Sequence, residues 1–365
     1  MAELLKDMYN YESLHEIAKR IQSVYHPFQV DEFLKSTMDQ SWDDLELKAR
    51  VRKISSNLGR YLPADYGDAL AILDQVVSTC SSNFFGILFP DFVEVYGQDE
   101  KNWNLSIKAL ERYTPYSSSE FAVRPFIINQ EERMMAQMYA WSKHENEHVR
   151  RLASEGCRPQ PPWAQALTKF KKDPAPILPI LEQLKADPSP YVRKSVANNL
   201  NDISKTHPER IAKLAKDWYG KNKDTDWIVK HGCRTLLKKG DREVLAIFGY
   251  QNADCIAVND FLLDKTTVAM GEDLCFSFYI LTDEATKVRL EYAVDYVKAS
   301  GKRSRKIFQI SELSLNKNEK KFYSKKLSFA DLTTRKHYPG MHAITLIVNG
   351  AERCNADFEL TENNM

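Results

Sequence analysis

The sequence lacks any apolar run close to the roughly 18 residues that a membrane-spanning helix needs. Its first 21 residues mix acidic and basic side chains and lack the apolar stretch of a signal peptide. We therefore predict no membrane partner. An excess of charge of one sign is missing as well, because 51 Lys and Arg residues stand against 50 Asp and Glu residues. Any basic surface for nucleic acid must then be local.

Paired cysteines are also absent. The six cysteines are Cys80, Cys157, Cys233, Cys255, Cys275 and Cys354. No two of them form a CxxC pair, which excludes a zinc ribbon and a thioredoxin motif, and a reduced, cytoplasmic setting is the simplest interpretation. The sequence has no GxGxxG, P-loop or GxSxG motif, so we predict no nucleotide cofactor and no serine-hydrolase elbow.

The 365 residues divide into two parts with different hydrophobic patterns. Residues 1 to about 250 place apolar side chains at helical spacing, most clearly over 14–25, 44–58, 66–80 and 132–142. After Gly249 short β-branched and aromatic runs follow at intervals of about ten residues, over 274–281, 288–297, 305–311, 321–329 and 342–350. We predict a multidomain chain, with an all-α domain over 1–250 and an immunoglobulin-like β-sandwich over 256–362.

The helical half contains a repeat. The segments NEHVRRLASEG, SPYVRKSVANNL and DWIVKHGCRTLL align on Val149, Val192 and Val229, at separations of 43 and 37 residues. These separations are near the ~40-residue period of HEAT-type helix pairs. Residues that favour the helix N-cap occupy equivalent positions before the valines, namely Asn146, Ser189 and Asp226. The chain should therefore form a HEAT-like stack of helices.

Polar side chains recur two, six and nine residues after each valine, which places them on one helix face. They are Arg151, Glu155 and Arg158, then Lys194, Asn198 and Asn201, then His231, Thr235 and Lys238. Stacking would bring the rows together on one mostly basic surface, and the candidate DNA-binding residues are Arg151, Arg158, Lys194, Asn198, His231 and Lys238. The alternative is a solvated face. The cations directly after the valines, Arg150, Arg193 and Lys230, are expected to pair with neighbouring repeats.

The segment VRRLASEGCRPQPPW, residues 149–163, combines basic, acidic and aromatic side chains within a short stretch. Two arginines precede one carboxylate, Glu155, and a proline-stiffened loop then delivers Trp163. An anion and an aromatic ring among basic residues suit a flat, cationic group that is attached to a polyanion. A DNA base alkylated at a ring nitrogen is such a group.

Residues 144–148 read HENEH and match the HExxH pattern of zinc hydrolases. On a continuous helix His144 and His148 would bind zinc, with Glu145 as the base. The repeat alignment instead puts a helix start at Asn146, inside the motif, and no third ligand follows at the metzincin spacing. We predict no metal site, and metal analysis of the purified protein decides this alternative.

The repeats, together with SSSEFAVRPFI (117–127) and ASEGCRPQPPWA (153–164), resemble the AlkC branch of the HEAT-like DNA glycosylases, a branch related to AlkD. An immunoglobulin-like C-terminal domain is a feature of one group within that branch. The resemblance spans essentially the whole chain. It implies a monofunctional glycosylase that excises cationic N3-methylated bases, 3-methyladenine foremost and 3-methylcytosine as a second candidate, from duplex DNA bent over the repeats. It implies no deep base-flipping pocket.

Carried over by motif, the resemblance makes Glu120, Glu155 and Trp163 the active-site trio. Each has a structural alternative. Glu120 could serve a helix N-terminus, Glu155 could form a surface ion pair with Arg151, and Trp163 could pack within its loop.

The predicted β-domain holds a second basic segment between residues 298 and 326, from which we select Lys302, Arg303, Arg305 and Lys306 as DNA-binding residues. We expect this segment to clamp the duplex across from the repeats, and the alternative is a solubilising hairpin. The expected partner is double-stranded DNA with alkylated bases, bound by a cytoplasmic, nucleoid-associated monomer. The competing function is a non-catalytic HEAT-repeat scaffold that binds protein or undamaged nucleic acid.

Overall fold

The structure, a computed structural model, describes residues 5–79, 84–250, 253–331 and 336–362. The chain divides into two compact units, one formed by residues 1–206 and 221–232 and the other by residues 207–220 and 233–365. The first unit is helical. The second combines three helices with a β-sandwich. Among the described residues no helix is both long and apolar enough to cross a membrane.

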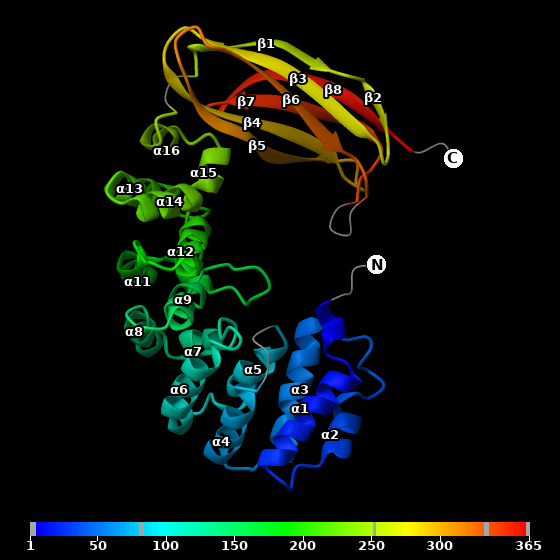
Figure 1. Cartoon of the computed structure of the whole chain (residues 1–365), viewed down its shortest axis with the longest axis vertical. Coiled ribbons are helices and arrows are strands. Elements are labelled where there is room, and N and C mark those ends of the chain that lie inside the picture. The colour runs from blue at the N-terminus through cyan, green and yellow to red at the C-terminus, as the bar shows by residue number, and fades with distance from the viewer. Residues whose placement is uncertain (1–4, 80–83, 251–252, 332–335, 363–365) are drawn as a thin grey trace. The chain divides into compact units, whose positions relative to one another are not determined.

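The helical unit holds thirteen of the α-helices that the structure describes, and Figure 1 shows them following one another along the chain. They are α1 (Tyr11–Val24), α2 (Val30–Thr37), α3 (Leu47–Tyr61), α4 (Tyr66–Val77), α5 (Leu88–Tyr96), α6 (Trp103–Tyr113), α7 (Val123–Asn129), α8 (Glu131–Trp141), α9 (Glu147–Glu155), α10 (Thr168–Lys172), α11 (Leu178–Leu184), α12 (Pro190–Ile203) and α14 (Lys223–Gly232). Short 3-10 helices lie at Leu5–Met8, Phe84–Ile87, Glu100–Asn102 and Ala175–Ile177.

Neighbouring helices pack in the order of a repeat array, because α9 contacts α12 and α12 contacts α14. Val149, Val192 and Val229 are all buried, as the alignment predicts. The Asn146 side chain caps α9 by accepting a hydrogen bond from the His148 N–H. Ser189 occupies the N-cap position of α12, as predicted, but its hydroxyl donates to Glu147 and makes no capping hydrogen bond.

The predicted cap Asp226 is wrong, because α14 already begins at Lys223 and Asp226 lies in its first turn. The side chain of Asn222 accepts hydrogen bonds from the N–H groups of Asp224 and Thr225 instead. The pairing of the first two cations after the valines is confirmed. Arg150 binds Asp187 at 2.6 Å, and Arg193 lies 3.4 Å from Asp224.

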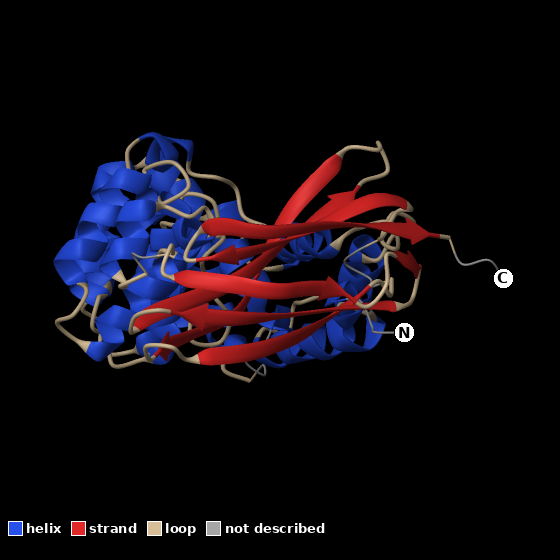
Figure 2. Ribbon diagram, turned by 90° about the horizontal axis from the view of Figure 1, so that it is seen from above, coloured by secondary structure: helices blue, strands red, loops and turns tan. Residues whose placement is uncertain are grey.

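The second unit contains α13 (Pro208–Trp218), α15 (Arg234–Lys238) and α16 (Arg242–Ile247) besides the strands. Its strands are β1 (Ile256–Leu263), β2 (Thr267–Ala269), β3 (Asp273–Thr282), β4 (Thr286–Val297), β5 (Arg303–Leu315), β6 (Lys320–Ser328), β7 (Gly340–Val348) and β8 (Ala351–Thr361). They are red in Figure 2. The domain limits 1–250 and 256–362 remain a prediction. The contacts between residues place these three helices in the same compact unit as the sandwich.

The strands form a three-stranded sheet, β1-β3-β6, and a five-stranded sheet, β2-β8-β7-β4-β5. Apolar side chains of both sheets share one buried core, for example Phe276 and Phe278 of β3 with Leu290 of β4 and Leu346 of β7. The predicted order of helical repeats followed by a β-sandwich is therefore confirmed. Strands β5 and β6 lie in different sheets, so they do not pair as the hairpin that the alternative interpretation of residues 298–326 assumes.

Candidate active site

A single arginine joins the two predicted catalytic glutamates. Glu120 lies just before α7, Glu155 is the last residue of α9, and Arg151 stands one turn earlier on α9. Arg151 lies 2.6 Å from Glu120 Oε2 and 3.7 Å from Glu155 Oε1. The Ser118 hydroxyl accepts a hydrogen bond of 2.8 Å from Arg151 and donates one of 3.0 Å to Glu120. Segments far apart in sequence thus hold two carboxylates around one guanidinium.

The row of charges continues behind Glu155. Arg158 contacts the Glu155 carboxylate and also donates to Asp202 at 2.9 Å, and Lys205 donates to the other Asp202 oxygen at 2.8 Å. Glu155 is only 5% exposed and Arg158 only 7%. Since buried charges are tolerated when they are paired and hydrogen-bonded, each group fixes its neighbour in one orientation.

Glu120 opens onto a cavity of about 340 Å³. Arg151, His148 and Tyr191 also line this cavity, and Phe121 forms part of its wall. The ring of Tyr191 lies 5.0 Å from the Arg151 guanidinium and 5.5 Å from the His148 ring. Glu155 is not among the residues that line the cavity, so the two glutamates differ in their access to a ligand there.

The loop after α9 presents Trp163 to solvent. Trp163 is 64% exposed, and its backbone has a φ of 65°, in the left-handed region that a bulky residue rarely adopts. Buried Arg124 of α7 holds both ends of this loop. Its guanidinium donates to the carbonyl groups of Gly156 and Arg158 at 2.9 Å each, and to that of Gln165 at 2.5 Å. Strain of this kind persists only where the surroundings impose it.

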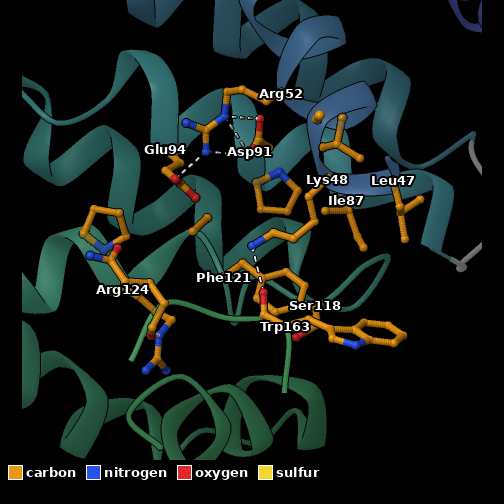
Figure 3. Close-up of a pocket in the computed structure, with 16 residues that line it drawn as sticks. Leu47, Lys48, Arg52, Ile87, Asp91, Glu94, Ser118, Phe121, Arg124 and Trp163 are labelled. Carbon is orange, nitrogen blue, oxygen red and sulfur yellow. Dashed lines mark hydrogen bonds and ion pairs between the residues drawn. The ribbon is translucent and has the colours of Figure 1, made fainter. Parts of the chain in front are cut away.

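A second cavity, of about 310 Å³, shares Ile87, Ser118 and Phe121 with the first (Figure 3). Arg52 pairs there with Asp91 and Glu94, while Lys48 reaches across to the Trp163 backbone. In Figure 3 the Trp163 indole points away from the Arg52 cluster. Burial raises the pKa of Glu94 even though Arg52 opposes this shift. The cavity therefore has a mixed lining, in which apolar side chains lie beside this ion-paired cluster.

Burial and charge act in opposite directions on the two arginines of the site. Burial alone would lower the pKa of Arg151, but the carboxylates of Glu120 and Glu155 outweigh it and leave the pKa above its ordinary value. Arg124 donates to neutral carbonyl groups, and burial lowers its pKa to about 10. Both remain protonated near neutral pH, so Arg151 bridges the glutamates as a cation.

The other predicted residues of the repeats lie on α12, α14 and α15. Lys194 and Lys238 are exposed, while Asn198 and His231 are half-buried. The His231 ring stacks on Trp227 with 5.1 Å between centroids. Lys238 belongs to the second unit and donates to the Ile307 carbonyl at 3.0 Å.

On β5 and the turn before it, Lys302, Arg303, Arg305 and Lys306 are all exposed. Arg303 lies 3.8 Å from Asp357, and Arg305 lies 2.7 Å from Glu352. Their charges are therefore partly balanced by acidic side chains of β8.

The HExxH pattern does not lie on one helix. Helix α9 begins at Glu147, after the cap Asn146, and His144 precedes it. His144 Nδ1 accepts a hydrogen bond from the Asn146 N–H, and His148 faces Tyr191. Among the described residues no group of three or more His, Cys, Asp or Glu side chains is placed to hold a metal ion.

Comparison with known proteins identifies the chain's relatives over its full length. A family model described as DNA alkylation repair enzyme matches residues 116–236, and one described as the C-terminal Ig-like domain of the uncharacterised protein YhaZ matches residues 257–362. YhaZ of Bacillus subtilis (strain 168) is 51% identical over 356 residues, which cover 98% of this chain and 99% of YhaZ.

Among solved structures, the Pseudomonas fluorescens alkylpurine DNA glycosylase AlkC, bound to DNA containing an abasic site analog, matches with a TM-score of 0.94 and 36% identity. The match covers 98% of this chain and 100% of that chain. The chain belongs to the AlkC family of DNA alkylation repair proteins. The resemblance that the two motifs indicate is confirmed.

The sequence pattern does not single out four residues of this candidate site, namely Lys48, Ser118, Arg124 and Tyr191. Ser118 and Arg124 lie within the motif SSSEFAVRPFI, so the motif contained them without revealing their contacts. Tyr191 directly precedes the aligned Val192, so an assignment of the α12 residues to helix faces could have indicated it. Lys48 lies 115 residues before its partner Trp163, and nothing in the local sequence indicates that contact.

Proposed function

We propose that this chain is a monofunctional DNA glycosylase that hydrolyses the N-glycosidic bond of cationic N3-alkylated bases in duplex DNA. The preferred base is 3-methyladenine, with 3-methylcytosine as the second candidate. The observation that supports this proposal most directly is the arrangement of Glu120, Arg151 and Glu155 beside a cavity. Trp163 is held exposed in the neighbouring loop. The membership of the AlkC family supports the same chemistry.

The chemistry needs fixed negative charge more than an acid. An N3-alkylated purine already carries a positive charge, so it leaves as a neutral base without protonation. The deoxyribose that remains becomes oxocarbenium-like. A carboxylate ~4 Å away stabilises such a charge by ~4 kcal/mol at an effective dielectric near 20, against ~1 kcal/mol in water. The difference of ~3 kcal/mol corresponds to roughly a hundredfold in rate.

The geometry suggests unequal tasks for the glutamates. Glu120 lines the cavity and is the carboxylate that faces the sugar or the attacking water. Glu155 is nearly enclosed and acts through Arg151, which it holds in place against Glu120. Arg158 belongs with this cluster, because its guanidinium points at Glu155 and Asp202. We place Trp163 against the sugar or a base edge, where an indole excludes water and favours cationic character.

Contacts to the DNA backbone are assigned to the more accessible residues of the repeats. These residues would bind phosphates without sequence preference, which suits an enzyme that searches for lesions. They are Lys194, Lys238, Asn198 and His231. Lys302, Arg303, Arg305 and Lys306 would contribute a clamp from the sandwich. The protein would act as a monomer on the nucleoid, within the cytoplasm.

Release of free base from methylated duplex DNA tests the proposal. The wild-type chain should release 3-methyladenine, and Glu120→Gln should lower the single-turnover rate by about tenfold to a hundredfold. Glu155→Gln should lower it as well, because Arg151 loses one of its two anchors. Asp99→Asn, an exposed acidic residue outside both cavities, is the matched control. Full activity of both glutamate variants would show that the site is assigned wrongly.

The competing scaffold function predicts no release at all. It is less favoured because a binding surface has no need of a paired carboxylate cluster beside a strained, exposed tryptophan. A folded wild-type protein that binds DNA but leaves methylated bases in place would favour the scaffold.

A further inference from the structure

Helices α3, α5 and α7 and the Trp163 loop line the cavity that contains the Arg52 cluster (Figure 3). Its volume of about 310 Å³ lies at the lower end of the range of small-molecule pockets, which begins at about 300 Å³. Val51, Pro90 and Phe121 contribute apolar surface, and Arg52 and Glu94 contribute charge. Apolar walls combined with a few polar groups are typical of a pocket for one small ligand.

The ion pairs of Arg52 leave one donor and one acceptor without a partner. Arg52 donates to both oxygens of Asp91 at 2.9–3.2 Å through Nε and Nη2, and Nη2 also contacts Oε1 of Glu94. Among the described residues none accepts a hydrogen bond from Arg52 Nη1, and none donates one to Glu94 Oε2. The Glu94 side chain is only 19% exposed, so a ligand in the cavity would meet this oxygen with little competition from bulk water.

This pair of groups decides what kind of ligand fits. An aminopurine carries an amino donor and a ring-nitrogen acceptor close together, and carboxylates and arginines are the side chains that pair with such groups on base edges. The Phe121 ring offers an aromatic surface against which a base of any kind can stack. A phosphate would be repelled by Asp91 and Glu94, and a wholly apolar molecule would strip water from the charges without replacing its hydrogen bonds. The lining therefore favours a nucleobase without its phosphate.

The position of the cavity indicates where such a base comes from. Ile87, Ser118 and Phe121 line both this cavity and the one that Glu120 lines, and Trp163 lines this one as well. We propose that the cavity binds the free base that leaves the deoxyribose, with its amino group toward Glu94 and a ring nitrogen toward Arg52.

This inference rests on the proposed function for the source of the base, and it adds a separate product site to it. No flipped nucleotide is required, because the base enters after the glycosidic bond has broken. A base that is held there is kept from recombining with the sugar.

Calorimetric titration of the full chain with free 3-methyladenine, without DNA, tests the inference. The wild type should bind one equivalent. Ala49 lines this cavity but not the Glu120 cavity, and it is exposed on α3, so Ala49→Phe should occupy the space and weaken binding at least tenfold. Ala71→Phe makes the same change at an exposed position of α4 outside both cavities and is the matched control. Wild-type affinity in the Ala49→Phe variant would place the base elsewhere and overturn the inference.

A second variant keeps the test decisive if Ala49→Phe does not fold. Glu94→Leu removes the open acceptor and should weaken binding by about tenfold. Glu132→Leu, at an exposed position of α8, is its control. Equal affinity of Glu94→Leu and the wild type would show that the polar edge of the base is not recognised there, which also refutes the inference.

Base release from methylated duplex DNA is measured separately, so the two proposals fail in different ways. A wild type that releases 3-methyladenine but does not bind the free base refutes the product site alone. A wild type that binds the free base in this cavity but releases none supports the base-binding site and refutes the glycosylase proposal.

Discussion

Lys48 of α3 donates a hydrogen bond of 2.9 Å to the carbonyl oxygen of Trp163, although 115 residues separate the two in the sequence. The same ammonium group lies 4.8 Å from the centre of the Phe121 ring, which lines both cavities. Arg124 fixes the ends of the tryptophan loop, and Lys48 fixes its exposed part. The N-terminal helices thereby take part in presenting Trp163.

Replacing Lys48 with methionine removes this hydrogen bond while it keeps a side chain of similar length. The loop should then populate other backbone conformations, because Trp163 no longer has a partner that favours its left-handed φ. We expect single-turnover base release to fall several-fold, with thermal stability almost unchanged since Lys48 is exposed. Lys19→Met on α1 is the matched control. Equal rates for Lys48→Met and the wild type would show that the tether is irrelevant to catalysis.

The order of the two architectures and the site motifs could be predicted from the sequence, because periodicity and short-range patterns report on local structure. The aligned valines found the buried faces of α9, α12 and α14. The cap of α14 was missed because Asp226 and Asn222 are both good caps, and the alignment of its valine favoured the wrong one. Strand partners were equally hidden, since β5 and β6 are adjacent in sequence but pair in different sheets.

The contacts of the site could not be predicted for a related reason. An arginine that binds carbonyl groups, as Arg124 does, has the same sequence pattern as one that binds phosphate. Arg158 is an example. Its position in the repeat suggested a DNA contact, whereas in the structure it is buried and contacts Glu155 and Asp202. Long-range packing decides between these roles.

Close packing around Gly156 leaves no room for a larger side chain, so its substitution should destabilise the helical unit. It follows Glu155 at the end of α9 with an ordinary helical φ of −63°, so conformational freedom is not the reason for a glycine. An added Cβ would lie 2.7 Å from a Val123 methyl group, 2.9 Å from Met138 and 3.0 Å from the Leu152 carbonyl oxygen. We expect Gly156→Ala to lower the free energy of unfolding by about 1–3 kcal/mol, measured by denaturant titration. An unchanged midpoint would mean that the helix end shifts freely.

Arg158 and Lys194 should respond differently to the same change, although the repeat pattern treats them alike. Lys194 is exposed, so Lys194→Met should weaken DNA binding and reduce the salt slope by about 1. Arg158→Met should leave the salt slope unchanged and lower base release, because Glu155 loses a buried partner. Binding titrations at several salt concentrations separate the two outcomes. A reduced slope for Arg158→Met would return this arginine to the DNA-binding surface.

The clamp from the sandwich is tested at two of its lysines, Lys302 and Lys306, so that the ion pairs of Arg303 and Arg305 with acidic side chains of β8 stay in place. Changing both lysines to serine removes two positive charges at exposed positions. If each lysine neutralises one phosphate, the log–log slope of duplex affinity against salt should fall by nearly 2. Lys216→Ser with Lys239→Ser, at exposed positions on α13 and just after α15, gives a control of equal charge. A slope that stays at the wild-type value in the test pair would remove the sandwich's β5 segment from the duplex-binding surface.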